Sequence, residues 1–153
     1  MSRIAIRVED PNWRKISRSL LPKLKRAVPL ALKHGGTSPK EALTIVLTDD
    51  AQLRALNLQF RGKNKPTNVL SFPAQTNGEH YLGDVAIAYG VSAAEALSSG
   101  RKLADHATHL AVHGVLHLLG YDHETNRQAK IMEPLETKIL AALGIADPYA
   151  EAA

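Results

Sequence analysis

One long apolar helix constrains the fold of this chain more than any other feature. A helical pattern runs from Asp105 to Leu119, and Gly120 follows it as the kind of residue that commonly ends a helix. Almost every position in this pattern is apolar except for a stripe of histidines. A helix of this composition must bury most of its surface. We therefore expect it to cross the core of one globular domain, with the histidine stripe lining a cleft.

Three histidines at the end of this helix have the spacing of metal ligands. His113 and His117 are four residues apart, which places them one turn apart on the same helical face. Gly120 lets the chain leave the helix, because glycine readily adopts left-handed backbone angles. His123 can then fold back toward the other two imidazoles. We interpret His113, His117 and His123 as the ligands of one metal ion.

The chain contains no cysteine, which excludes disulfides, a thiol nucleophile and cysteine-based zinc sites. Any metal must therefore be held by His, Asp or Glu. Imidazole ligation favours Zn²⁺, although Ni, Cu and Fe also bind it. Three protein ligands without an obvious fourth leave one coordination position open, as in catalytic sites. His106 and His109 share the same helical face, and we expect them to support the site or to pack structurally.

The residue after the first histidine separates two classes of metalloenzyme. Zinc peptidases of the His-Glu-x-x-His type carry a general-base glutamate there, whereas this chain has Gly114. Peptide hydrolysis by that mechanism therefore lacks its base. Glu124 or Glu133 could replace it only if the fold brought one of them close.

Positive charge is concentrated near the start of the chain. Residues 1–33 contain nine Lys or Arg and two acidic residues, whereas residues 34–153 contain ten basic and thirteen acidic residues. Such asymmetry favours a polyanionic partner, because Lys and Arg displace counterions from phosphates. A solvated helix face is an equally good reading of the charge alone. The start of the chain lacks the apolar core of a signal peptide, and no stretch is long enough to span a bilayer, so we expect a soluble, cytoplasmic protein.

The remaining patterns predict strands interleaved with helices. Together they indicate a small mixed sheet with helices packed on it and no internal domain boundary. The expected strands are 3–8, 43–47, 68–72 and 81–89, and the expected helices include 11–33 (kinked or divided by two prolines), 92–98, 105–119 and 126–143. A further helix is expected to be capped by Thr48 or Asp49 and to stop near Gly62. Pro134 is expected to bend or separate the first turns of the last helix. A turn is expected over 75–79, and Pro73 suggests that the strand before it lies at a sheet edge.

Three segments resemble a known family. His113–His123 (HGVLHLLGYDH), Phe60–Pro73 (FRGKNKPTNVLSFP) and Leu82–Ala88 (LGDVAIA) are similar to the YbeY family of bacterial endoribonucleases. The resemblance covers about residues 43–148 and is weak in the N-terminal third. Pro134 is a departure that is unexpected in the last helix of the family.

The resemblance implies a single α+β domain, spanning residues 1–153, with a mostly parallel sheet of about four strands. It implies a zinc-dependent endoribonuclease that cuts single-stranded RNA in rRNA maturation, at the 3′ end of 16S rRNA, and in ribosome quality control. His113, His117 and His123 would be the zinc ligands, and Arg61 a functional arginine of the cleft. RNA, and the ribosome or its proteins, would be the partners. A planar guanidinium suits phosphate, which agrees with this role for Arg61.

Two other functions remain open from the sequence. The first is a ribosome-assembly factor without enzymatic activity, in which His109 or Asp122 completes a closed metal site. The second is a zincin-like metalloprotease, against which Gly114 argues. The sequence does not distinguish water from the ribose 2′-OH as the attacking group, and it leaves the role of Asp84 open.

Overall fold

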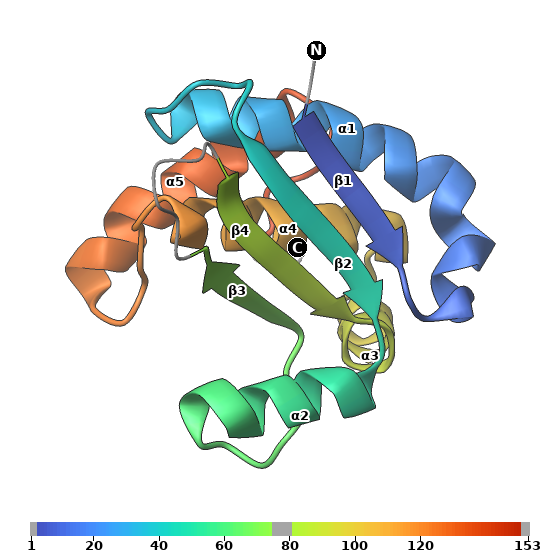
Figure 1. Ribbon diagram of the computed structural model, residues 1–153. Helices are drawn as coiled ribbons and strands as arrows, with labels where there is room; N and C mark the ends of the chain where they lie inside the picture. The colour runs from blue at the N-terminus through green and yellow to red at the C-terminus, as the bar shows by residue number, and fades with distance from the viewer. Residues whose placement is uncertain (1–2, 75–80, 151–153) are drawn as a thin grey trace.

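The computed structural model describes residues 3–74 and 81–150. The turn expected over 75–79 therefore lies outside the described residues. Strands and helices are interleaved in the first part of the chain, and after two consecutive strands the last three described elements are helices (Figure 1). Their bounds are β1 Arg3–Val8, a 3-10 helix Pro11–Ile16, α1 Ser17–His34, β2 Ala42–Thr48, α2 Asp50–Arg61, β3 Val69–Pro73, β4 Tyr81–Ala88, α3 Tyr89–Ser99, α4 Leu103–Leu118 and α5 Asn126–Ala141.

The four strands form one sheet in the order β1-β2-β4-β3. The β1–β2 and β2–β4 pairs are parallel, and β3 pairs antiparallel with β4. The mostly parallel α+β architecture expected from the sequence is thus confirmed. Strand β3 is an edge strand that ends at Pro73, as expected for a residue that cannot donate to a ladder.

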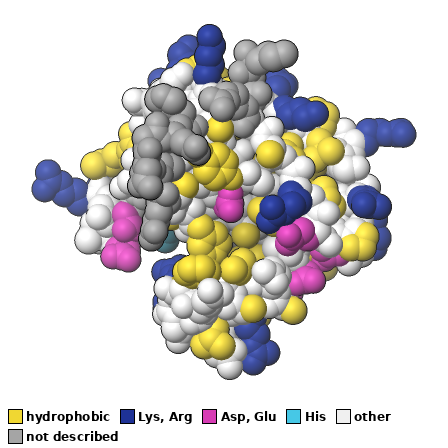
Figure 2. Space-filling view, viewed as in Figure 1, with side chains coloured by type: hydrophobic (Ala, Val, Ile, Leu, Met, Phe, Trp, Pro, Cys, Tyr) yellow, Lys and Arg dark blue, Asp and Glu magenta, His cyan; other side chains and the backbone are white. Residues whose placement is uncertain are grey.

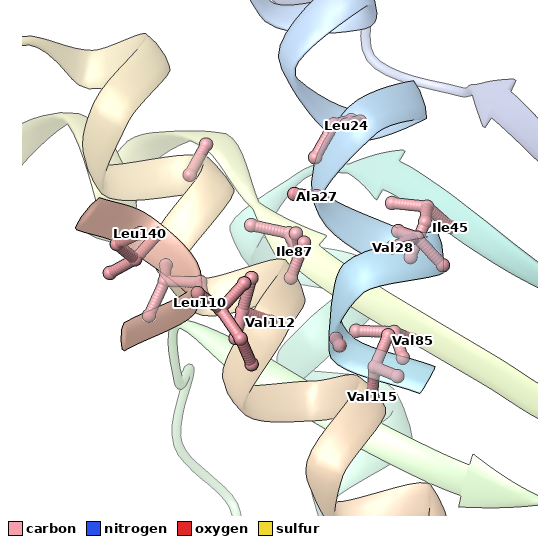
Figure 3. Close-up of a cluster of buried hydrophobic side chains, with 14 of the residues drawn as sticks. Leu24, Ala27, Val28, Ile45, Val85, Ile87, Leu110, Val112, Val115 and Leu140 are labelled. Carbon is pink, nitrogen blue, oxygen red and sulfur yellow. The ribbon is translucent and has the colours of Figure 1, made fainter. Parts of the chain in front are cut away.

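One face of the sheet carries the main hydrophobic core. Helices α1, α4 and α5 lie behind the sheet in the view of Figure 1, and α4 is the central one. Side chains from β2 and β4 meet those of the three helices in this layer (Figure 3). The labelled members are Leu24, Ala27 and Val28 of α1, Ile45 of β2, Val85 and Ile87 of β4, Leu110, Val112 and Val115 of α4, and Leu140 of α5. The expectation that the histidine helix crosses the core is confirmed.

The opposite face of the sheet is covered only in part. A smaller buried cluster there includes Val46, Leu70 and Ala86, against which Leu56 of α2 packs. Helix α2 lies across one end of this face and leaves the rest of the strands without a covering helix (Figure 1). This half-covered face forms part of a cleft, which Val46, Leu70 and Ala86 help to line.

Helix α2 begins and ends where the sequence predicts. The Asp49 side chain accepts a hydrogen bond from the Gln52 backbone N–H at 2.8 Å, which caps the first turn. Gly62 follows the last residue with φ +68°, a left-handed conformation that glycine adopts without steric cost. These two ends fix Arg61 as the final residue of the helix.

Of the two effects expected from Pro22 and Pro29, the structure shows a bend and not a division. Helix α1 runs through both prolines as one bent helix (Figure 1), and α5 runs through Pro134 without a break. Pro22 and Pro134 are exposed, so their rings meet solvent on the outer face of each helix. Proline removes one backbone hydrogen bond there without breaking the buried face. Among the described helices, none combines the length and the apolarity needed to cross a membrane.

Candidate metal centre

The three predicted histidines meet at the C-terminal end of α4. The Nε2 atoms of His113 and His117 lie 3.0 Å apart. The ring of His123 has its centroid 4.8 Å from that of His113 and 5.1 Å from that of His117. One ring nitrogen from each residue falls within 4.8 Å of the others. The structure thus brings together the three side chains that the sequence pattern selected.

A helix-ending turn returns His123 to this point. Gly120 has φ +99°, and the Tyr121 N–H donates to the Leu116 carbonyl at 3.0 Å, which closes the end of α4. The side chain of Asp122 then accepts the backbone N–H of His123 at 2.7 Å. This bond fixes the backbone from which the His123 imidazole projects.

A buried carboxylate from another helix supports the centre. Glu136 of α5 is fully buried. Its Oε1 atom lies 2.8 Å from Nδ1 of His113 and 3.0 Å from Nε2 of His109. Its Oε2 atom accepts the hydroxyl of Tyr149 at 2.7 Å. One carboxylate therefore holds three side chains from two other segments.

These hydrogen bonds fix the proton on one ring. Burial by itself would raise the pKa of Glu136, but the hydrogen bonds from His109 and His113 outweigh it and hold that pKa at about 2. The ionised carboxylate can only accept, so Nδ1 of His113 carries the hydrogen. The lone pair of His113 is then on Nε2, the atom that faces His117. Histidines that bind metals are commonly oriented by a carboxylate in this way.

The neighbouring imidazole, that of His117, also favours its neutral form. Burial, followed by repulsion from His113 and His123, lowers the pKa of His117. A neutral imidazole has a free lone pair, as a metal ligand requires. Three converging imidazoles, one of them oriented by a carboxylate, therefore fit a transition-metal ion.

A second group of possible ligands comprises His109, His113 and Glu136. Their atoms already lie at hydrogen-bond distances, so hydrogen bonding accounts for this arrangement. Nε2 of His109 also approaches the hydroxyl of Tyr149 at 3.3 Å. His109 therefore acts on Glu136 and not as a fourth ligand of the three-histidine group.

Glu136 and Tyr149 are functional residues that the sequence motifs did not indicate. A signal for Glu136 was present, because Met132, Ile139 and Leu140 mark the buried face of α5 and Glu136 lies on that face. A carboxylate on the buried side of a helix needs partners. Nothing in the pattern indicated that Tyr149, beyond the end of α5, would reach it.

The histidines open into a cleft of about 1240 Å³. Arg61, Phe60 and Phe72 line it together with His113, His117 and His123. Phe60 is 60% exposed, and its ring centroid lies 5.2 Å from that of Phe72. Figure 2 shows a hollow on the left of this face in which histidine is visible next to basic side chains.

Arg61 is exposed at the end of α2, and within the described part of the chain its guanidinium forms no ion pair. The group is therefore available to an anion that enters the cleft. Lys63 and Lys65, which follow Arg61 in the same basic loop, are exposed and are not among the residues that line the cleft.

Gly114 explains why no glutamate follows the first histidine. A Cβ atom at this position would come within 2.4 Å of Cγ1 of Val85 in β4. The Ser71 hydroxyl donates to the Gly114 carbonyl at 2.8 Å, which ties the helix to β3 at the same point. The side-chain position that carries the base in zinc peptidases therefore faces the sheet. Of the two possible substitutes, Glu124 lines the cleft and Glu133 does not.

The structure shows the contacts of His106 and Asp84, whose roles the sequence left open. Nε2 of His106 pairs with Oε1 of Glu95 at 2.9 Å, so it bonds outside the three-histidine group. Asp84 accepts a hydrogen bond from the Tyr81 hydroxyl. Because its neighbour Val85 faces α4, Asp84 points to the other side of the sheet and does not support a ligand histidine.

Comparison with known proteins identifies the family. The family described as "Endoribonuclease YbeY" matches residues 6–144. The Endoribonuclease YbeY of Paramagnetospirillum magneticum is 45% identical, covering 97% of this chain and 96% of its own. That of Chelativorans sp. is 47% identical, covering 83% of this chain and 81% of its own. This chain belongs to the YbeY family of endoribonucleases.

The family match begins at residue 6 and therefore includes α1. The resemblance that rests on the sequence motifs covers only about residues 43–148. A solution structure of a Thermotoga maritima protein shares the fold, with a TM-score of 0.55 at 22% identity over 97% of this chain and 99% of that one. Family membership supports nuclease activity. The three segments that resemble the family meet at the cleft, because each contributes residues to its lining: His113–His123, Phe60–Pro73 and Leu82–Ala88.

Proposed function

We propose that this chain is a zinc-dependent endoribonuclease that cuts single-stranded RNA in the cytoplasm. We propose further that it acts in rRNA maturation, at the 3′ end of 16S rRNA, and in ribosome quality control. In this proposal the whole of residues 1–153 acts as one YbeY-like domain. His113, His117 and His123 hold the zinc ion, and Arg61 is the catalytic arginine.

The observation that carries the proposal is the meeting of three imidazoles in the cleft that Arg61 also lines. A zinc ion bound there would act as a Lewis acid toward the phosphodiester and would lower the pKa of an attacking hydroxyl. His113 and His117 offer Nε2 atoms 3.0 Å apart, and Glu136 keeps the first of these unprotonated. The ligands are therefore arranged before the substrate binds.

Arg61 supplies positive charge where negative charge develops. Phosphodiester cleavage increases the charge on the non-bridging oxygens, and a fixed cation beside them stabilises the transition state. The guanidinium can donate two parallel hydrogen bonds to those oxygens. Because α2 ends at Arg61 under a glycine cap, the side chain projects from a fixed backbone position.

The shape of the cleft favours an unpaired strand. Phe60 is exposed and the half-buried Phe72 lies against it in the cleft that Arg61 also lines, and bases that are not paired can stack on such rings. A duplex keeps its bases inside the helix and offers mainly its backbone. We therefore expect preference for single-stranded RNA.

The test compares single-stranded and duplex RNA of the same sequence. Nuclease-free, zinc-loaded protein should cut the single strand, and H113A should abolish the cut while leaving the folded circular-dichroism spectrum intact. Equal cleavage by wild type and H113A would reveal a contaminant, and absence of cleavage by wild type would refute the assignment. Preserved rRNA processing in cells that carry R61A and H117A would instead support a non-enzymatic assembly factor.

The ends of the products identify the attacking group. A 2′,3′-cyclic phosphate would mean attack by the ribose 2′-OH, and a linear monoester would mean attack by water. Either product is compatible with the roles given to Arg61 and the three histidines. The same experiment on a chain-length series of RNA would show how many nucleotides the cleft holds.

A further inference from the structure

The segment from Pro11 to His34 is strongly basic and contains no acidic residue. It carries seven Lys or Arg, which exceeds the net charge of +4 of the whole chain. The segment comprises the 3-10 helix and α1. Opposite charges three or four residues apart stabilise a helix. Helix α1 has no such acidic partners of its own.

Four of these basic residues form a stripe on one side of α1, which we call the α1 stripe: Arg18, Lys25, Arg26 and Lys33. The last three lie seven, eight and fifteen residues after Arg18. At about 100° per residue, the four positions fall within about 100° of one another around the helix, over a length of about 22 Å. All four side chains are exposed.

The α1 stripe lacks protein partners in the part of the chain that the structure describes. Lys23, which lies beside it, pairs with Asp105 at 2.5 Å and is neutralised. The described ion pairs include no member of the stripe. Four positive charges therefore project into solvent from a fixed helix.

The stripe lies apart from the cleft. The other side of α1 packs into the core through Leu20, Leu24 and Val28, so the stripe faces outward. None of its four residues lines the cleft. In Figure 2, Lys and Arg side chains stand along the top and right margins, where α1 runs in Figure 1, whereas the hollow is on the left.

We propose that the α1 stripe binds the phosphate backbone of RNA outside the cleft, so that a long RNA is held at two places. The inference rests on the proposed function only in taking the RNA to be the one that is cut in the cleft. Each Lys or Arg that meets a phosphate releases counterions and strengthens binding without reading sequence. The stripe would thus raise affinity for long RNA and leave the chemical step unchanged.

RNA fits the stripe better than an anionic membrane does. A helix that lies in a membrane interface inserts an apolar face beside its basic residues. The apolar face of α1 is buried against α4 and the sheet, so it has no such face to insert. A basic helix without an accessible apolar side suits a soluble polyanion.

The test removes the four charges and compares two lengths of RNA. The variant R18Q/K25Q/R26Q/K33Q keeps helix propensity, because Gln ranks close to Lys and Arg. A control variant, K102Q/R127Q/K130Q/K138Q, removes the same charge from exposed residues that do not line the cleft. Binding to a long rRNA fragment is measured against salt, and cleavage is measured on an oligonucleotide of about five residues.

The stripe variant should bind the long RNA about tenfold or more weakly, and the salt dependence of log K should fall by about 3. The control variant should keep most of the affinity and slope of the wild type. All three proteins should cut the short oligonucleotide at the same rate, because it reaches only the cleft.

An unchanged salt slope, or an equal loss in both variants, would overturn the inference. Wild-type binding to phosphatidylserine vesicles that requires the stripe, with RNA affinity unaffected, would overturn it in favour of a membrane. If wild type cut no RNA but the stripe variant alone lost affinity, the proposed function would fail and the binding surface would stand.

Discussion

The cleft and the α1 stripe use charged and polar side chains in opposite ways. Beneath the cleft, the buried Glu136 holds His109, His113 and Tyr149 by hydrogen bonds, and each side chain has a fixed direction. On α1, four cations project into solvent without partners among the described residues. Hydrogen-bond partners restrict the conformations of a side chain, and in return they hold it in the orientation that catalysis requires. Unpaired surface charge supplies affinity that does not depend on geometry. The following substitutions test that division.

The largest effect is expected from removing a histidine of the centre. H117A should lower zinc content to near zero and abolish detectable RNA cleavage, because two imidazoles bind the ion far less tightly. Zinc is measured by elemental analysis of the purified protein. The matched control is H106A on the same helix, whose ring pairs with Glu95 at 2.9 Å and should be dispensable for zinc. Equal zinc loss in both variants would remove the distinction between these histidines.

Arg61 should affect the reaction without affecting the metal. R61A should reduce kcat/KM by about 10²–10³-fold, the range found when one donor to a transition-state oxygen is lost, and should retain zinc. The control is R54A on the same helix, where the guanidinium Nε donates to Asn64 at 2.8 Å. If R61A weakened only the binding of RNA and kcat stayed constant, Arg61 would belong with the α1 stripe as an affinity residue.

Glu136 should change zinc affinity before it changes the fold. E136Q keeps the shape of the side chain but lets an amide N–H face a ring nitrogen, so the proton on His113 is no longer fixed. We expect zinc affinity, measured by competition with a chelating dye, to fall about 10–100-fold. E133Q, three residues earlier on α5, should bind zinc as the wild type does. Unchanged affinity in E136Q would show that the His113 ring is oriented by packing alone.

The smallest effects should be on stability. G114A places a methyl group against Val85 and should lower the free energy of unfolding by about 1–3 kcal/mol. S19A on the exposed side of α1 should change it by less than about 0.5 kcal/mol. The losses of G114A and V85A should be less than additive in the double variant G114A/V85A, because the truncated Val85 leaves space for the new methyl group. Urea unfolding measures each variant, and equal losses in G114A and S19A would mean that α4 is no more tightly packed than the surface of α1.

The sequence predicted the elements that depend on local patterns. Apolar periodicity located α4, Gly120 marked its end, and the His113–His123 spacing anticipated a convergence that the backbone then provides. Pro73 indicated the edge position of β3. Each of these depends on nearby residues, which explains why they can be inferred from a single sequence.

The parts that could not be predicted depend on contacts distant in the sequence. Tyr149 reaches Glu136 only because the segment after α5 folds back over α4, and no local pattern records that path. The sequence likewise left the side of Asp84 open, because the direction of a strand residue follows from register and not from its type. The pattern also left open whether Pro22 and Pro29 kink α1 or divide it, and α1 stays one helix because packing of its buried face outweighs the lost hydrogen bonds.

The central claim is that three imidazoles hold one ion and leave a coordination position for substrate. X-ray absorption at the zinc edge of the fully loaded protein tests it most directly. We expect one ion per chain, with three histidine nitrogens and one exchangeable oxygen bound to it. An ion closed by a fourth side chain, or zinc bound with equal stoichiometry after His113, His117 and His123 are all replaced by alanine, would contradict it.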